Sequence, residues 1–282
     1  MSRCSRWPAA LSAFAISHRF VSRSKPGAAG AIGAADVARS KPDGYTFLVV
    51  WPDPLISVVA TTKTAYQPDQ DFRFMTKIAA NGFVLLASPS IKPNSLQELI
   101  AEARAASAPL AYASFGPGSL PQLVMQTVSR QTGAKFLDVA YKGSGPAIND
   151  VISGQLPPCF AAPMQAGPLV ADGRLKALAV TGPQRSKLLP QVPTFKEAGV
   201  DSFLTGNGTW IALVAPAGMP PGVEAKMSQV VRNAIADNDI MRYLEGLGFD
   251  PLGNSPAEAT TEFAEEYAQV TRQIREMGIS SR

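Results

Sequence analysis

Residues 110–119 read Leu-Ala-Tyr-Ala-Ser-Phe-Gly-Pro-Gly-Ser, and residues 136–145 read Phe-Leu-Asp-Val-Ala-Tyr-Lys-Gly-Ser-Gly. In each stretch a short apolar run leads into a loop of small residues, and a segment with helical periodicity follows, at 120–131 and at 146–152. The second helix has Pro146 at its predicted first position, where the missing N–H costs nothing. Strands that alternate with helices in this way indicate an α/β protein.

Loops of this kind direct backbone N–H groups and the positive end of a helix toward one point. They can hold a carboxylate or a phosphate without an arginine. Two such loops in succession predict a two-sided clamp for a small anion.

The length of 282 residues, 46% of them hydrophobic, is enough for two α/β domains. Alternating apolar and helical segments from 44 to 218 favour mostly parallel sheets. Outside the two loop units, the sequence predicts strands at 45–50, 83–87, 176–181 and 210–215. It predicts helices at 31–39, 95–106, 224–236, 239–247 and over about twenty residues between Ser255 and Gly278.

The net charge of +4 is unevenly distributed. Residues 1–35 carry five basic side chains and no acid, and the remaining chain carries 21 basic and 22 acidic side chains. A basic stripe interleaved with aromatic residues is absent, so we expect no nucleic-acid partner.

Two cysteines, Cys4 and Cys159, and one histidine, His18, occur in the chain. We expect no disulfide, and Cys159 is predicted to be a small buried side chain. His18 lies within the first 25 residues, so the globular part that follows has no histidine for a catalytic triad or a metal site. No carboxylates are clustered there either. We expect no catalytic group, no metal and no cofactor.

Residues 1–25 form an atypical leader, with a basic start and a short apolar stretch that Pro8 interrupts. An Ala-Phe-Ala at 13–15 resembles a cleavage site, but Arg19 follows closely, so an export signal is weak or missing. The glycine-rich stretch 27–33 does not fit a dinucleotide fingerprint, because Ala28 stands where the first glycine is required.

Several motifs together resemble the substrate-binding receptors of tripartite tricarboxylate transporters, a periplasmic binding-protein family. They are Gly-Ala-Ile-Gly at 30–33, Pro-Asp-Gly-Tyr-Thr at 42–46, Tyr66 with Pro68, Asp71 and Phe72, Tyr-Lys-Gly-Ser-Gly-Pro-Ala at 141–147, Ala-Leu-Ala-Val-Thr at 177–181, Arg-Ser at 185–186, Leu-Pro-Gln-Val-Pro-Thr at 189–194, Glu-Ala-Gly at 197–199 and Ala-Pro-Ala-Gly at 215–218. The resemblance extends from about residue 26 to the C-terminus.

The resemblance implies a two-lobed, type II-like periplasmic binding protein with a ligand cleft between lobes that close by hinge motion. It implies an extracytoplasmic receptor, acting as a monomer, that captures a small carboxylate (a di- or tricarboxylate, an aromatic acid or an amino acid) for the permease subunits in the membrane. We expect residues 26–108 with 217–282 to form lobe 1 and residues 109–216 to form lobe 2.

The candidate ligand-binding residues lie mainly in the two loops, and Trp51, Asp53 and Ala161 complete the set. In the first loop they are Ser114, Phe115, Gly116, Gly118 and Ser119, and in the second Tyr141, Lys142, Gly143 and Ser144. Other roles remain open for them. Ser119 can form a capping box with Gln122, the glycines can serve positive φ, Lys142 can be a solvated charge, and Tyr141 can belong to a core.

The chain departs from the family pattern in three places. The apolar strand and glycine-rich loop that begin family members have no counterpart in residues 1–25, so lobe 1 is predicted to be incomplete. Trp51 and Asp53 stand where small or hydroxyl residues are usual, and Ala161 stands where Asp is frequent. Asp53 would repel a second carboxylate and suit an ammonium group if it faces the cleft, or it is a turn residue between prolines.

Two other functions stay open. A truncated, non-functional receptor product is one, because of the missing first loop. An enzyme on the same scaffold with Lys142 or Ser144 as nucleophile is the other, although neither has a neighbouring base in the sequence.

Overall fold

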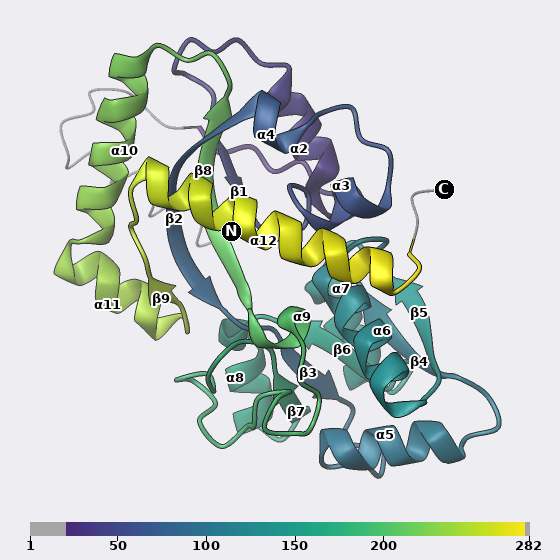
Figure 1. The fold of residues 1–282 in the computed structure, drawn as a ribbon. Coiled ribbons are helices and arrows are strands. Elements are labelled where there is room, and N and C mark those ends of the chain that lie inside the picture. Colours follow the sequence, from purple (N-terminus) through teal and green to yellow (C-terminus); the bar gives the residue numbers. More distant parts are fainter. Residues whose placement is uncertain (1–20, 280–282) are drawn as a thin grey trace.

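The structure is a computed structural model, and it describes residues 21–279. Two lobes lie one above the other (Figure 1). The upper lobe is built on a four-stranded sheet in the order β1-β8-β2-β9. Its strands are β1 (Leu48–Val50), β2 (Phe72–Asn81), β8 (Thr209–Pro216) and β9 (Asp250–Pro251).

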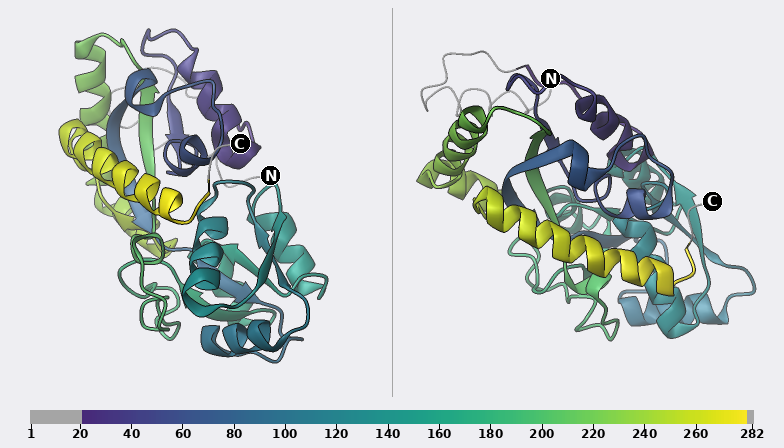
Figure 2. Two further views of the ribbon diagram at one scale, coloured as in Figure 1. Left: turned by 45° about the vertical axis from the view of Figure 1, so that its right-hand side comes forward. Right: turned by 45° about the horizontal axis from the view of Figure 1, so that its top comes forward.

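Helices cover this sheet and extend beyond it. They are η2 (Ala28–Gly30), α2 (Ala31–Ala38), α3 (Ser57–Thr61), α4 (Pro68–Asp71), α10 (Pro221–Ile235), α11 (Asn238–Gly246) and α12 (Pro256–Glu276). The long helix α12 crosses β2 and runs on toward the lower lobe, as all three views show (Figures 1 and 2). There Arg130 donates a hydrogen bond to the carbonyl oxygen of Glu276, so α12 connects the two lobes.

The lower lobe contains a three-stranded sheet in the order β6-β3-β7 and the pair β4–β5. Its strands are β3 (Val84–Ala87), β4 (Leu110–Ser114), β5 (Phe136–Ala140), β6 (Pro158–Ala161) and β7 (Lys176–Val180). Its helices are α5 (Leu96–Ala105), α6 (Leu120–Thr132), α7 (Ser144–Ile152), α8 (Pro163–Ala171) and α9 (Phe203–Gly206).

The prediction of mostly parallel sheets is wrong for the ladders between these strands. Only β4 and β5 pair in parallel, whereas β8 runs antiparallel to β1 and β2, and β3 runs antiparallel to β6 and β7. The reason lies in the connections between the lobes. Strand β2 leads out of the upper lobe and β8 returns to it, so neighbours in that sheet must run in opposite directions.

Two strands also pair in a different lobe from the one predicted for them. Strand β3, expected in lobe 1, pairs within the lower lobe, and β8, expected in lobe 2, pairs within the upper lobe. The crossovers therefore lie near Gly82 and Gly208, where backbones approach closely. A Cβ on Gly82 would collide with the carbonyl oxygen of Thr181, and one on Gly208 would lie 2.7 Å from the carbonyl oxygen of Asn81. The chain needs glycine at both places.

Most predicted elements are present. Ser255 and Glu258 form the expected capping box at the start of α12, and Ser95 caps α5. Helix α7 begins two residues earlier than predicted, after Gly143, so Pro146 is its third residue rather than its first. Cys159 is fully buried in β6, as expected.

The upper lobe holds a buried ionic group beneath α12. Lys77 is 5% exposed and its Nζ lies 3.0 Å from a Glu262 oxygen and 3.7 Å from a Glu266 oxygen. The indole Nε1 of Trp210 donates to the same Glu266 at 2.6 Å. Because the buried charges of Lys77 and Glu266 are paired and bonded, their burial is tolerated, and together with the half-exposed Glu262 they tie α12 to β2 and β8.

Within residues 21–279 no helix is both long and apolar enough to cross a membrane. Residues 1–20, which hold most of the predicted leader with Cys4 and His18, lie outside the described residues.

Candidate functional site

The two predicted loops meet at the ends of the parallel strands β4 and β5. The backbone N–H of Tyr141 donates to the carbonyl oxygen of Ser114 at 2.9 Å, which joins the start of one loop to the start of the other. The helices that follow, α6 and α7, therefore begin side by side at the same edge of the sheet. This neighbourhood is the one that the sequence predicts.

The backbone donors of the β4–α6 loop (residues 115–119) form hydrogen bonds within the protein. Each N–H from residue 115 to residue 120 has an acceptor within the protein, apart from Pro117, which has no N–H. The pairs are Phe115 N with Ser119 Oγ (3.2 Å), Gly116 N with Ser114 Oγ (3.0 Å), Gly118 N with Gln122 Oε1 (2.8 Å), Ser119 N with the Gly116 oxygen (3.1 Å) and Leu120 N with Asp53 Oδ2 (3.3 Å).

These bonds assign structural roles to the two serines. Ser114 and Ser119 are fully buried, and both hydroxyl oxygens accept from the loop itself. The capping box between Ser119 and Gln122 is not formed, because each side chain accepts from a different loop amide. In this conformation the loop has no free N–H for an anion.

Asp53 belongs to the upper lobe and caps the N-terminus of α6. Its side chain is 9% exposed and accepts the N–H of Leu120, the first residue of α6. Burial raises the pKa of Asp53 to about 7; the bond from Leu120 opposes this rise, and the nearby Glu266 carboxylate adds to it. A cavity of about 20 Å³ lies beside the two acids, room for about one water molecule. Asp53 is thus a buried carboxyl group at an interlobe contact.

The same contact presses the loop against α3. A Cβ on Gly118, which has φ of 78°, would collide with Thr61 Oγ1 and approach the backbone of Val58 to 3.0 Å. The upper lobe therefore closes on the β4–α6 loop directly, with no gap for a ligand at this point.

The β5–α7 loop (residues 141–144) is open by comparison. No group among residues 21–279 accepts a hydrogen bond from the backbone N–H of Lys142, Gly143 or Ser144. Gly143 has φ of 114° and ψ of 177°, a conformation that is almost restricted to glycine, and nothing lies within 4 Å of a Cβ built there. The loop thus presents three free donors at the N-terminus of α7.

Side chains of this loop point in different directions. The Ser144 hydroxyl lies 2.9 Å from Gln165 Oε1 on α8, and an amide is not a base that could activate it as a nucleophile. The Tyr141 hydroxyl donates to Asp150 at 2.5 Å, which raises the pKa of Tyr141. Lys142 is exposed.

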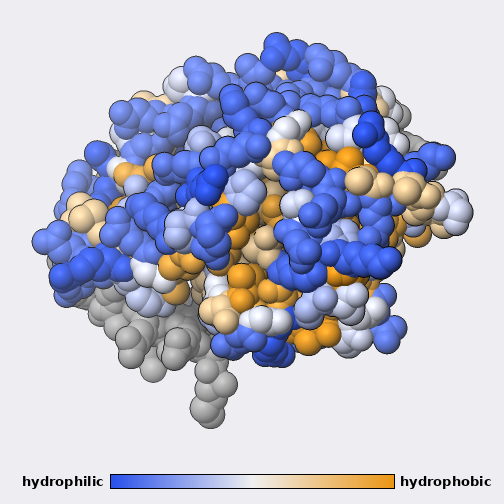
Figure 3. Space-filling model, turned by 90° about the horizontal axis from the view of Figure 1, so that it is seen from below, coloured by the Kyte–Doolittle hydropathy of each residue, from blue (hydrophilic) through white to orange (hydrophobic). Residues whose placement is uncertain are grey.

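Three aromatic rings contact one another in succession, those of Trp51, Phe83 and Phe115, and Phe115 belongs to the β4–α6 loop. They are called the aromatic wall below. Ring centroids are 5.8 Å apart between Trp51 and Phe83 and 5.7 Å apart between Phe83 and Phe115. Trp51 and Phe115 are half-exposed, and Phe83 is buried. Figure 3 shows apolar side chains gathered near the centre of the face seen from below, framed by polar ones.

Ala161, at the end of β6, is fully buried and pairs with Val84. It offers a ligand no polar side-chain group. Phe83 and Gln165 were not predicted as site residues, and no motif in the sequence marks either one.

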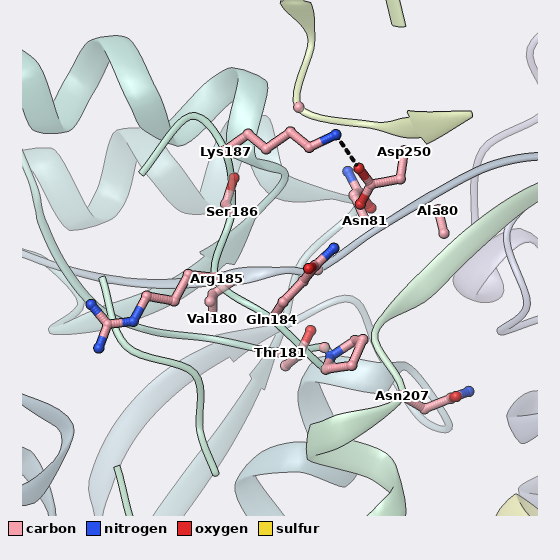
Figure 4. A pocket seen from close by; sticks show the side chains of 14 residues that line it. Ala80, Asn81, Val180, Thr181, Gln184, Arg185, Ser186, Lys187, Asn207 and Asp250 are labelled. Atoms are coloured by element: carbon pink, nitrogen blue, oxygen red, sulfur yellow. Dashed lines mark ion pairs between the residues drawn. The ribbon is translucent and has the colours of Figure 1, made fainter. Parts of the chain in front are cut away.

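A separate cavity of about 120 Å³ lies at the crossover between the lobes (Figure 4). None of the predicted site residues lines it. Lys187 and Asp250 form an ion pair of 2.8 Å at this cavity, and Arg185 turns away to pair with Glu197. The side-chain amide of Asn81 is buried there and has no hydrogen-bond partner within the described part of the chain.

Residues 14–279 match the family described as tripartite tricarboxylate transporter family receptor. The chain belongs to this family. Protein BugT of Bordetella pertussis is 29% identical over 264 residues, which cover 92% of this chain and 79% of that protein.

Solved structures agree along nearly the whole length. A structure from R. palustris with adipate has a TM-score of 0.90 at 27% identity and covers 99% of this chain and 93% of its own. MatC from Rhodopseudomonas palustris with bound malate has a TM-score of 0.85 at 26% identity, covering 95% and 91%. The periplasmic binding protein BugD has a TM-score of 0.89 at 25% identity, covering 98% and 92%. These findings confirm the predicted two-lobed fold class and the periplasmic location.

Proposed function

We propose that this protein is a periplasmic receptor that binds a small carboxylate at the β5–α7 loop and delivers it to the membrane subunits of a tripartite transporter. The observation that carries the proposal is the set of three N–H groups at Lys142, Gly143 and Ser144 that have no acceptor among residues 21–279, beside the interlobe contact. Relatives in the same family support it, because their structures contain adipate and malate.

Backbone donors are sufficient for this task. A hydrogen bond to a charged acceptor contributes about 1.5 to 3 kcal/mol, so three of them hold a carboxylate without an ion pair. The N-terminus of α7 adds a favourable field for a negative group. Gly143 is essential to the arrangement because its backbone conformation, φ of 114° and ψ of 177°, is nearly restricted to glycine.

The part of the ligand beyond its carboxylate would contact the aromatic wall. Half-exposed rings at Trp51 and Phe115 come from the upper and the lower lobe respectively. A ligand that touches both rings favours the closed arrangement over an open one, because its contacts are complete only when the lobes are together. The glycine crossovers at Gly82 and Gly208 are the places where the hinge would bend.

Isothermal titration calorimetry of the purified chain with a panel of carboxylates tests the proposal. We expect at least one acid to bind with Kd near 1 µM, about −8 kcal/mol, and its neutral amide to bind far more weakly. A cooperative thermal melt in the same preparation establishes that the chain is folded. A folded protein that binds no acid of the panel would contradict the proposal, and a chain without a cooperative melt would favour a non-functional receptor product.

Delivery is tested with purified membrane subunits of a tripartite transporter in lipid vesicles. We expect accumulation of the acid only when the receptor is present, and we expect the receptor to act as a monomer of 29.7 kDa in light scattering.

A further inference from the structure

We infer that closure of the two lobes is coupled to the uptake of a proton by Asp53, so that the protein holds a carboxylate more tightly at acidic than at alkaline pH. The effect on ligand affinity rests on the proposed function. The link between the proton and closure does not, because it depends only on the contact between Asp53 and the lower lobe.

Both lobes enclose the Asp53 side chain. It lies in the upper lobe just before α3, is 9% exposed and accepts the N–H of Leu120 at 3.3 Å. On the lower-lobe side, the cavity of about 20 Å³ beside it is lined by Leu120, Leu123 and Leu204. Separation of the lobes would withdraw these leucines and let water reach the carboxyl group. The surroundings of Asp53 therefore differ between the closed and the open arrangement.

No positive side chain balances a charge on Asp53. None of the ion pairs among residues 21–279 includes it. The charged group that acts on it is the buried Glu266 of α12, which adds a second negative charge. Lys77 is bonded to Glu266 and to Glu262 instead. Helices α3, α6 and α9 present no titratable side chain to this cavity.

Burial without a cation disfavours the charged form of a carboxyl group. The N–H of Leu120 favours that form, but burial outweighs it and raises the pKa of Asp53 to about 7. An aspartate in water has a pKa of about 4, which we expect for Asp53 once the lobes separate. The closed form then binds more protons than the open form between these values. Protonation therefore stabilises closure below about pH 7, and this contribution is lost as the pH rises further.

Calorimetry of the full chain tests the coupling with adipate and malate, the acids in two relatives' structures. We expect the Kd of either acid to be about tenfold higher at pH 8 than at pH 6. Titrations in buffers of different ionisation enthalpy should show uptake of about 0.9 proton per bound acid at pH 6. Binding with no proton uptake and with equal Kd at both pH values would overturn the inference and leave the proposed function in place.

Asp53→Asn shows whether Asp53 is the group that takes up the proton. Asparagine has nearly the same size and keeps an acceptor for Leu120, but it does not titrate. The variant should bind the acid with nearly equal Kd at pH 6 and pH 8, and its proton uptake should be lost. Asp172→Asn is the matched control, because Asp172 is exposed at the end of α8 and should leave the wild-type pH dependence unchanged. Undiminished proton uptake in Asp53→Asn would contradict the role of Asp53.

Small-angle X-ray scattering of the ligand-free chain decides the coupling if neither acid binds. An open protein is larger than a closed one, so the radius of gyration of the wild type should be larger at pH 8 than at pH 6. It should be the same at both pH values in Asp53→Asn. In that case a wild-type radius that does not change with pH would overturn the inference.

Discussion

The β4–α6 loop and the β5–α7 loop have similar sequence patterns, but their backbone N–H groups are hydrogen-bonded differently. Both follow strands of one parallel pair, both are rich in glycine and serine, and both open a helix. The first gives every N–H to an acceptor inside the protein, and the second has three N–H groups without an acceptor in the region that the structure describes. One loop is therefore part of the interlobe contact, and the other is the binding surface that we propose.

The difference comes from residues outside the shared pattern. Gln122 supplies an acceptor four residues after Gly118, and Asp53 supplies another from the upper lobe, 67 positions away in the chain. The β5–α7 loop has no equivalent side chain, since Ser144 bonds to Gln165 instead of to the loop. A glycine-rich turn before a helix is thus a potential anion site only while its own side chains leave the donors free.

The largest expected effect is on ligand binding at the open loop. Gly143→Ala forces a side chain into a backbone conformation that is nearly restricted to glycine, so the N–H groups of residues 142–144 lose their alignment. We expect carboxylate affinity to fall by about 100-fold, about 2.7 kcal/mol, in calorimetry. Gly133→Ala is the control, because Gly133 also has positive φ (73°) but ends α6 away from the loops. Similar losses in both variants would contradict the proposed site.

The next effect concerns the closed loop and its pH dependence. The pKa of Asp53 in the folded protein is about 7, above the ordinary value of 3.8 for an aspartate, so between these values the folded state binds more protons than the unfolded state. Stability contributed by Asp53 is therefore present below about pH 4 and is lost as the pH rises to about 7. Asp53→Asn keeps an acceptor for Leu120 and does not titrate.

We expect Asp53→Asn to be more stable than the wild type by about 4 kcal/mol at pH 8, with the difference vanishing below about pH 4. Urea unfolding at the two pH values measures it. A stability difference that is the same at both pH values would show that the pKa of Asp53 is not raised in the folded protein.

A pair of serine variants separates the two loops most clearly. Ser119→Ala leaves the buried N–H of Phe115 without an acceptor, so it should lower the free energy of unfolding by about 1 to 2 kcal/mol and change affinity little in the folded fraction. Ser144→Ala removes a half-buried hydroxyl beside the free donors, so it should lower affinity severalfold and cost less than about 0.5 kcal/mol of stability. The reverse pattern would exchange the roles that we assign to the loops.

The smallest effect is expected at Lys142. Its side chain is exposed, and the proposed site uses its backbone N–H. Lys142→Ala should therefore change the Kd by less than about threefold, with only weak dependence on salt, because exposed charges contribute little in screened solution. A loss of about 30-fold or more would indicate that the ammonium group binds the ligand.

Local patterns predicted the elements of this fold well, because they depend on neighbours in the sequence. The strands at 110–114 and 136–140, the helices after them and the serine caps of α5 and α12 follow from apolar spacing and capping residues. Strand direction was predicted poorly. Whether β8 returns beside β2 is decided by the path of the chain between the lobes, and no residue of β8 encodes it locally.

The site was predicted only in outline. The sequence placed both loops at one edge, but it could not show that Asp53, described as either a cleft residue or a turn residue, would accept the N–H of Leu120. That bond depends on how the upper lobe rests on α6. Phe83 and Gln165 were missed for the same reason, since their relation to the loops exists only in the folded chain.

The most direct test of the central claim follows individual backbone amides by ¹H–¹⁵N correlation NMR while a carboxylate that binds in calorimetry is added. We predict the largest shifts at Lys142, Gly143 and Ser144, whose N–H groups are free, and little change at residues 115–120, whose donors are engaged. Large shifts at residues 115–120 with none at residues 142–144 would contradict the account.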